Sequence, residues 1–172
     1  MSSWAECARG EAISIPPVHT RSLLKIENPS PEKARLHLEY VDDDEVKNIG
    51  QIVSVKMNTF CFTKDMITRL KNKVGGQNTS YEIICAHIWR HTTKAREHLH
   101  GKKVGFISIV NMRERVDPAL GKAYFGNAFM WTIATATSVE LEEEDLASTA
   151  ERIHRSLISC TKETFHNWLH WL

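Results

Sequence analysis

The stretch TSYEIICAHIWRHTTKAR, residues 79 to 96, decides the fold, because its chemistry predicts a helix that belongs to the core. Thr79 or Ser80 can cap the start, and Glu82 stands three residues after Thr79, where its carboxylate can reach the free amides of the first turn. The apolar positions that follow recur at helical spacing and predict one broad stripe packed against a sheet. The stripe comprises Tyr81, Ile84, Cys85, Ile88 and Ala95, with Trp89 and Thr92 beside them.

The hydroxyl-rich start of this helix is also a candidate anion site. Backbone N–H groups and the positive end of the helix dipole point toward whatever lies before the helix, which favours a phosphate or another anion. Capping alone accounts for the same residue types, and it is the interpretation that this feature favours when taken by itself.

Upstream of this stretch, the sequence predicts a strand followed by a short helix. Residues 52–62 alternate and are rich in Val, Phe and Thr, which is typical of a strand. Residues 64–74 predict a helix that Thr63 caps and that Gly75-Gly76 ends.

Downstream, the sequence predicts two strands and a final helix. Residues 101–110 and 127–137 have strand character, and a loop separates them at residues 111–126. The second strand carries no charge, which predicts that it is covered on both faces. Residues 142–145 are acidic and predict the start of a helix that runs to the end of the chain. Its predicted inner face comprises Leu146, Ala150, Ile153, Leu157, Cys160, Thr164, Trp168 and Leu172.

The N-terminal part predicts little regular structure. Residues 2–9 are typical of the last turns of a helix that Gly10 ends, and residues 11–38 predict an irregular connector. The acidic run at residues 41–46 predicts a solvated loop, with a metal site as the less favoured interpretation, because no second group of ligands accompanies it. The connector contains Pro16, Pro17, Pro29 and Pro31. Together these segments predict an α/β fold class with mixed α+β layers.

Composition excludes some partners. The 172 residues include 22 basic and 21 acidic side chains, and this net charge of +1 gives no electrostatic argument for nucleic acid or an anionic membrane surface. The four cysteines are widely spaced without a Cys-x-x-Cys pair, which favours a reducing compartment. The sequence shows no basic region followed by an apolar run and no stretch of membrane-spanning length, so it predicts a cytoplasmic protein.

Histidine pairs offer a metal-binding hypothesis. Of the nine histidines, His87 and His91 lie four residues apart on the predicted helix, as do His166 and His170 near the end of the chain. The Glu that follows the first His of a zinc-peptidase helix is missing from both pairs, and no third ligand can be named. Polar positions on amphipathic helices are the favoured interpretation, and no metal ligand is predicted.

Arg113 and Arg115, in the sequence VNMRERV, stand at the end of a predicted strand. Such loops often carry binding groups on a rigid scaffold, and paired arginines suit a phosphate. The alternating Arg-Glu-Arg pattern equally suits a surface ion-pair cluster, so spacing alone leaves both interpretations open.

The succession of these segments resembles one family. TSYEIICAHIWRHTTKAR, then VNMRERVDPALGKAYFGN, then an acidic-headed helix that ends in ETFHNWLHWL is similar to the plant BAHD acyltransferases, particularly the hydroxycinnamoyl transferases. The segments WAECARG, PPVHTRSLL and HLEY agree with that resemblance, which spans essentially the whole chain. It implies transfer of an acyl group, in particular a hydroxycinnamoyl group, from a CoA thioester to a hydroxyl or amine in plant secondary metabolism.

The resemblance also implies an architecture and a set of partners. It implies a two-domain fold like chloramphenicol acetyltransferase, with residues 1–45 as the tail of the N-terminal domain and crossover connector and residues 46–172 as the first part of the C-terminal domain. Acyl-CoA would be a co-substrate, with no permanently bound cofactor, and a small alcohol or amine would be the acceptor. Full-length relatives would be monomers.

On the CoA side, the resemblance carries over to a few residues. Thr79 and Ser80 match family positions near the CoA, and Arg113 matches the arginine of the strand-end loop and is the first choice for a CoA phosphate contact. Arg115 and Lys73 are the weaker choices. The YFGN segment, residues 124–127, is expected to be mainly structural, with Gly126 permitting a tight turn.

The catalytic side of the family is missing from this sequence. The family's general base is the His of a His-x-x-x-Asp motif, and none of the nine histidines here is followed four residues later by Asp. The family's Asp-Phe-Gly-Trp-Gly motif is absent as well. The chain is therefore expected to be an internal fragment with no catalytic residue and no turnover alone. The alternative is a non-catalytic truncated product or interaction module, and a His-rich metal-binding domain is the third hypothesis.

Overall fold

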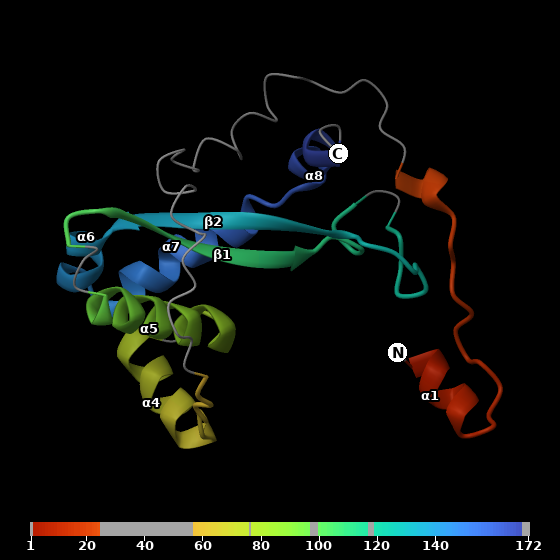
Figure 1. Ribbon diagram of the computed structural model, residues 1–172, viewed down its shortest axis with the longest axis horizontal. Coiled ribbons are helices and arrows are strands. Elements are labelled where there is room, and N and C mark those ends of the chain that lie inside the picture. Colours follow the sequence, from red (N-terminus) through yellow and green to blue (C-terminus); the bar gives the residue numbers. More distant parts are fainter. Residues whose placement is uncertain (1, 25–56, 76, 97–99, 117–118, 170–172) are drawn as a thin grey trace. The chain divides into compact units, whose positions relative to one another are not determined.

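The computed structural model describes residues 2–24, 57–75, 77–96, 100–116 and 119–169, whose helices and strands are labelled in Figure 1. The chain divides into two compact units. The first unit takes its residues from 1–36, 109–131 and 160–172, and the second takes its residues from 37–108 and 132–159.

Two predictions fall outside the described residues. The acidic loop at residues 41–46 and the domain boundary after residue 45 both lie within residues 25–56. Both therefore stay predictions.

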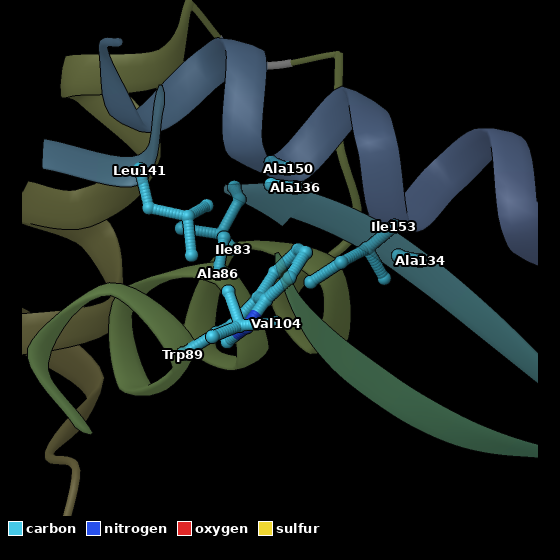
Figure 2. Packing of buried hydrophobic residues seen from close by; sticks show 9 residues of the cluster. All are labelled: Ile83, Ala86, Trp89, Val104, Ala134, Ala136, Leu141, Ala150 and Ile153. Carbon is cyan, nitrogen blue, oxygen red and sulfur yellow. The ribbon is translucent and has the colours of Figure 1, made fainter. Parts of the chain in front are cut away.

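The second unit is built around α5 (Ser80–Ala95), which packs mainly against α7 (Leu146–Ile158) and also contacts α4 (Lys64–Val74) and α6 (Ser138–Glu143). Figure 2 shows its core, where apolar side chains from α5, α6, α7 and both strands of the sheet gather in one cluster. Paired strands covered by helices confirm the predicted mixture of α and β layers. The cluster comprises Ile83, Ala86, Trp89, Val104, Ala134, Ala136, Leu141, Ala150 and Ile153.

The predicted core helix is confirmed as α5, but its predicted buried face is largely wrong. Ile83 and Ala86 are fully buried, although neither belongs to the predicted stripe. They share a helical face with Trp89, the one member of that stripe that is buried. Small residues on this face, such as Ala86, let α5 approach α7 closely, and apolar spacing does not reveal that preference. The exposed members of the predicted stripe are Tyr81, Ile88, Thr92 and Ala95.

Two antiparallel strands form the sheet. β1 (Lys103–Asn111) and β2 (Phe129–Thr137) confirm the strands predicted at these positions. The amide of Met112 donates to the carbonyl of Ala128 and the amide of Ser138 donates to the carbonyl of Lys102, each at 2.9 Å, so the strands run antiparallel.

The prediction that β2 is covered on both faces is wrong. Its residues alternate between buried and more accessible positions, and the Trp131 side chain is 55% exposed. An antiparallel sheet commonly packs one face on the core and leaves the other accessible, whatever its composition. The uncharged sequence of β2 reflects apolar residues on both faces, not burial of both.

The strand predicted at residues 52–62 is also wrong in its described part. Residues 57–63 form no strand, and Met57 is 96% exposed and Phe60 79% exposed. A strand is stable only when a neighbouring strand takes up its backbone hydrogen bonds, and no described strand pairs with these residues. By contrast, the cap of α4 is confirmed, because the Thr63 hydroxyl accepts from the amide of Met66 at 3.3 Å and Gly75 adopts φ 82°.

The first unit contains α1 (Ser2–Ala8), the 3-10 turn η1 (Arg21–Leu24) and α8 (Lys162–Leu169). Gly10 has φ 73° and ends α1 as predicted. The connector is irregular over residues 11–20, apart from an isolated bridge, and η1 is a turn that the sequence did not predict.

The final helix was predicted as one continuous element, and this prediction is wrong. Thr137 caps α6 through a capping box with Glu140, and Asp145 caps α7 by accepting from the amide of Ser148 at 2.7 Å. The Thr161 hydroxyl accepts from the amide of Thr164 at 3.2 Å before α8 begins. Short polar side chains compete with the helix for its own amides, so each of these caps starts a new helix where apolar spacing alone runs on.

Candidate functional site: a capped helix start and an arginine loop

The start of α5 has the predicted capping box. The Thr79 hydroxyl accepts from the amide of Glu82 at 3.3 Å, and the Glu82 carboxylate accepts from the amide of Thr79 at 2.7 Å. The hydroxyl and the amide of Thr79 are therefore already used in capping the helix. The amides of Ser80 and Tyr81 lie in the first turn, where no acceptor exists within the helix. These two amides and the Ser80 hydroxyl are the groups that an incoming anion can meet.

Glu82 is buried, with only 4% of the residue exposed, and it links α5 to α7. Its second carboxylate oxygen lies 2.9 Å from Nδ1 of His154. Burial by itself raises the pKa of Glu82, but hydrogen bonds from His154 and Thr79 outweigh burial, so the pKa lies below its ordinary value. The carboxylate is thus ionised at neutral pH and holds the helix start in a fixed position.

Lys73 lies in the last turn of α4, as the sequence predicted. It lines an open groove of about 550 Å³, together with side chains of α5, of the end of α6 and of the first residue of α7. Among the described residues, Lys73 has no carboxylate partner within ion-pair distance.

Arg113 follows β1 and is bonded to its own loop. Its Nε donates to the carbonyl of Tyr124 at 3.2 Å, and its Nη2 donates to the carbonyl of Gly126 at 2.6 Å. Its Nη1 donates to Oδ1 of Asn111 at 3.1 Å. A guanidinium has five N–H groups, so these three bonds leave two N–H groups without a partner among the described residues. Most of the binding capacity of Arg113 therefore goes to the loop that carries it.

Arg115 also bonds to backbone within the first unit. Its Nη1 donates to the carbonyl of Cys160 at 3.2 Å, just before α8. This bond ties the loop after β1 to the residues that precede α8.

The YFGN segment packs tightly for a different reason than predicted. Gly126 does not have a positive φ, unlike Gly121 at φ 70°. A Cβ at Gly126 would lie 2.9 Å from Cε1 of Tyr124, a residue that is 5% exposed. Glycine is needed there because the ring of Tyr124 approaches the backbone closely. Val18 pairs with Tyr124 in a parallel bridge, which holds the N-terminal connector against this segment.

The five predicted site residues thus fall into two groups. Lys73, Thr79 and Ser80 belong to the second unit, and Arg113 and Arg115 belong to the first.

The histidine pairs do not assemble a described metal site. The rings of His87 and His91 lie 4.1 Å apart between centroids, and Nδ1 of His91 lies 2.8 Å from the carbonyl oxygen of His87. His166 lies on α8, and His170 is outside the described residues. Within the described part of the chain, no group of three or more His, Cys, Asp or Glu side chains is placed to hold a metal ion.

Two residues that position the start of α5 were not predicted from the sequence. His154 contacts Glu82 from 72 positions further along the chain, and the Tyr81 hydroxyl donates to Oγ of Ser108 at 3.3 Å. His154 lies on a helix whose inner face was predicted from apolar residues, so no local signal distinguished it from a solvent-exposed histidine.

Helices packed on a two-stranded antiparallel sheet make this a mixed α/β protein. A model described as Transferase family matches residues 1–172, the whole chain. The chain belongs to this family, the BAHD acyltransferases, whose members are acyl-CoA-dependent transferases.

Relatives with assigned activities agree with that membership. The chain is 30% identical over 186 residues to the Hydroxycinnamoyltransferase of Narcissus pseudonarcissus and 27% identical over 184 residues to the Shikimate O-hydroxycinnamoyltransferase of Nicotiana tabacum. Each alignment covers 100% of this chain and 42% of the relative. It is also 30% identical to the Omega-hydroxypalmitate O-feruloyl transferase of Arabidopsis thaliana, over 86% of this chain and 34% of that protein. The chain thus spans less than half the length of these curated relatives.

Solved structures support the fold. Vinorine Synthase superposes with a TM-score of 0.66 over 99% of this chain and 38% of its own, at 20% identity. F. sporotrichioides TRI101, solved in complex with Coenzyme A and T-2, superposes with a TM-score of 0.53 over 63% of this chain and 28% of its own, at 22% identity. The chain therefore has the mixed α/β architecture that forms part of a two-domain chloramphenicol acetyltransferase-like fold.

No helix among the described residues is both long enough and apolar enough to cross a bilayer. None of the four cysteines, all of which the structure describes, forms a disulfide, and Cys160 is buried while Cys7 and Cys61 are exposed.

Proposed function

We propose that this chain is the donor-binding part of an acyltransferase that moves a hydroxycinnamoyl group from CoA to the hydroxyl or amine of a small molecule. The observation that carries the proposal is the match of the whole chain to the transferase family, together with its full-length alignment to a Hydroxycinnamoyltransferase. The complex of TRI101 with Coenzyme A supports the choice of donor. The protein would act in the cytoplasm, as part of a monomer whose N-terminal domain ends near residue 45.

On the donor side, the start of α5 would hold part of the CoA. The Ser80 hydroxyl and the two first-turn amides would donate to phosphate or pantetheine oxygens, favoured by the positive end of the helix. Thr79 would act indirectly, because its hydroxyl already caps the helix. Lys73 would add a positive charge on the same unit, although it lies beside the later turns of α5 and not beside its start.

From the strand-end loop, Arg113 would contribute its two remaining N–H groups to a CoA phosphate. Its other three donors hold the loop, so the same side chain would fix the loop's shape and present the charge. Arg115 is the weakest member of the set, because its bond to the carbonyl of Cys160 already gives it a structural role.

The chain should not complete the reaction by itself. The acceptor must lose a proton as it attacks the thioester, and none of the histidines in the 172 residues stands in a His-x-x-x-Asp motif. This observation also favours a second candidate function, a non-catalytic product that binds CoA or associates with intact relatives.

Binding and turnover of the 172-residue chain test the proposal together. Calorimetric titration should show CoA binding more tightly than pantetheine, and Ser80→Ala should weaken CoA binding about threefold or more, because a hydrogen bond to a charged group is lost. Assays with several hydroxycinnamoyl-CoA donors and a panel of alcohols and amines should give background rates.

Two results would contradict the proposal. Equal affinities for CoA and pantetheine would show that the chain makes no stabilising contact with the CoA phosphates. A measurable rate that His87→Ala or His166→Ala abolishes would give a helical histidine the role of general base.

A further inference from the structure

A basic groove in the second unit is not used by the proposed donor site, apart from Lys73. It has a volume of about 550 Å³ and lies between α4, α5, the end of α6 and the start of α7. The size falls within the range of small-molecule sites. Three positively charged side chains line it, which we call the groove cations: Lys73, Arg90 and Lys94. The imidazoles of His87 and His91 line it beside them.

The basic side chains, histidines included, come mainly from one face of α5. The α5 members span positions 87 to 94, and at the rise of an α-helix this row extends about 10 Å. A second hollow of about 290 Å³ shares Lys94 and Glu142 with the groove and adds Arg96 and His100. Positive side chains therefore continue from one hollow to the next, in a chain whose net charge is only +1.

Among the described residues, few acidic groups lie near the groove. Glu142 is the one carboxylate that lines it, and Asp145 is close enough to Arg90 for the arginine to lower its pKa, after hydrogen bonds to Ser148 that lower it more. Within the described residues, none of the groove cations forms an ion pair with a carboxylate. Like charges gathered without partners make a local positive potential that attracts anions.

The His87 side chain lies among these basic groups. Desolvation lowers its pKa, and the charges of His91, Lys73 and Arg90 lower it further. Phe62 packs edge-on against the His87 ring, with centroids 6.1 Å apart. A bound anion would counter the repulsion and raise the pKa again, so His87 would take up a proton when the groove is filled.

We propose that the basic groove binds a compact diphosphate, either inorganic pyrophosphate or the terminal diphosphate of a nucleotide. Arg90 offers a planar fork of donors and Lys94 and Lys73 offer ammonium groups, a combination that suits two adjacent phosphoryl groups. The row of about 10 Å is longer than a single phosphate requires and can contact both. Leu70 and Leu146 also line the groove and give it apolar surface against which the nucleoside of a nucleotide can pack.

A purely structural role for these cations makes a different prediction. Positive side chains near the C-terminal end of a helix stabilise it through the helix dipole, with or without a ligand. In that case, neutralising them would lower thermal stability, but pyrophosphate would not bind.

The test is calorimetric titration of the 172-residue chain with inorganic pyrophosphate at fixed ionic strength. The double variant Arg90→Gln/Lys94→Gln should weaken binding about tenfold, because two charge-assisted contacts are lost. Glu142→Gln should tighten binding about threefold, because a repulsive carboxylate is removed. Lys64→Gln, which neutralises a lysine on α4 outside the groove, is the matched control and should leave the affinity unchanged.

Proton linkage and the source of the diphosphate complete the test. Affinity should rise as the pH falls from about 7.5 to 6.5, and His87→Gln should reduce that rise. A titration with ADP distinguishes the sources, since tighter binding of ADP than of pyrophosphate assigns the groove to a nucleotide and equal or weaker binding assigns it to inorganic pyrophosphate. Ser80→Ala should leave pyrophosphate binding unchanged, so failure of the donor proposal and failure of this one are separable.

The proposal is overturned if neither the parent chain nor Glu142→Gln binds pyrophosphate. It is also overturned if a folded Arg90→Gln/Lys94→Gln variant keeps the parent affinity. Circular dichroism checks that the double variant folds. If the double variant does not fold, Glu142→Gln still tests the proposal, because it leaves every groove cation in place.

Discussion

The start of α5 and the Arg113 loop were both singled out as anion sites, yet the structure uses their polar groups in opposite ways. At the start of α5, the capping bonds connect residues three apart and leave the Ser80 hydroxyl and two amides open. In the loop, Arg113 donates three hydrogen bonds to acceptors as far as 13 residues away in the sequence. The caps at the helix start use neighbouring residues and leave some polar groups unbonded, whereas in the loop the carbonyls of Tyr124 and Gly126 take their hydrogen bonds from the Arg113 side chain.

The largest expected effect falls on the side of α5. Glu82→Ala removes the acceptor of the Thr79 amide and the partner of His154 in a buried site, so it should lower the free energy of unfolding by about 2–4 kcal/mol. Glu82→Gln is the matched variant, because an amide keeps the shape and can accept from Thr79. Urea unfolding of the two variants should show a clearly smaller loss for Gln, and equal losses would mean that the charge matters more than the capping geometry.

Acid titration sharpens the same point. The folded-state pKa of Glu82 is depressed from 4.5, so its contribution to stability is present above pH 4.5 and disappears as the pH falls through the lower folded-state value. The parent chain should lose stability relative to Glu82→Gln between about pH 5 and pH 3. A constant difference across that range would show that the carboxylate gains nothing from being ionised.

The next effect falls on the loop. Gly126→Ala places a Cβ 2.9 Å from the Tyr124 ring, which is buried and must shift, so it should cost about 1–2 kcal/mol. Tyr124→Leu should relieve most of that cost in the double variant. Gly75→Ala is the control, because its cost arises from φ 82° with nothing within 4 Å of the new Cβ, and Tyr124→Leu should leave it unchanged. Additive costs in the Gly126 cycle would argue against the close approach.

How far the sequence predicts this molecule follows from the range of the contacts. Caps at Thr63 and Thr79 and the stop at Gly75 were predictable, because each acts within one helical turn. The break of the final helix at Thr161 used the same local chemistry and was missed because the apolar spacing continued across it.

Other features depend on partners far along the chain. The face that α5 buries is set by α7, and the strand expected at residues 52–62 lacks a described partner for residues 57–63. At the candidate site, residue types pointed to Ser80 and Arg113, but only the folded loop shows that Arg113 is largely occupied by the carbonyls of Tyr124 and Gly126.

The next prediction compares acyl-CoA donors in their dependence on Arg113. In an intact enzyme containing these residues, Arg113→Ala should raise the Michaelis constant for an acyl-CoA about tenfold or more, since directed, charge-assisted bonds are lost. Turnover at saturation should change much less, because binding equally strong in the ground and transition states does not affect the chemical step.

An acyl-pantetheine separates the two roles of Arg113. It lacks the nucleotide phosphates, so it should lose affinity only through the altered loop and therefore lose less than acyl-CoA. Arg113→Lys keeps the charge without the planar fork and should preserve part of the acyl-CoA affinity. Equal losses for both donors would assign Arg113 to the loop alone.

The smallest expected effects separate two adjacent residues at the start of α5. Thr79→Ala removes the cap and should cost about 1 kcal/mol of stability, which for a chain of this size lowers the melting temperature by about 2–4 °C. It should leave CoA affinity nearly unchanged, because the Thr79 hydroxyl is already bonded to Glu82. Ser80→Ala should do the reverse, with stability unchanged within about 0.5 kcal/mol and weaker CoA binding. Thr79→Ser keeps the cap and should match the parent chain in both measurements. If Thr79→Ala weakens CoA binding as much as Ser80→Ala does, the ligand displaces the capping box, and the distinction between a committed and an open hydroxyl at this helix start is wrong.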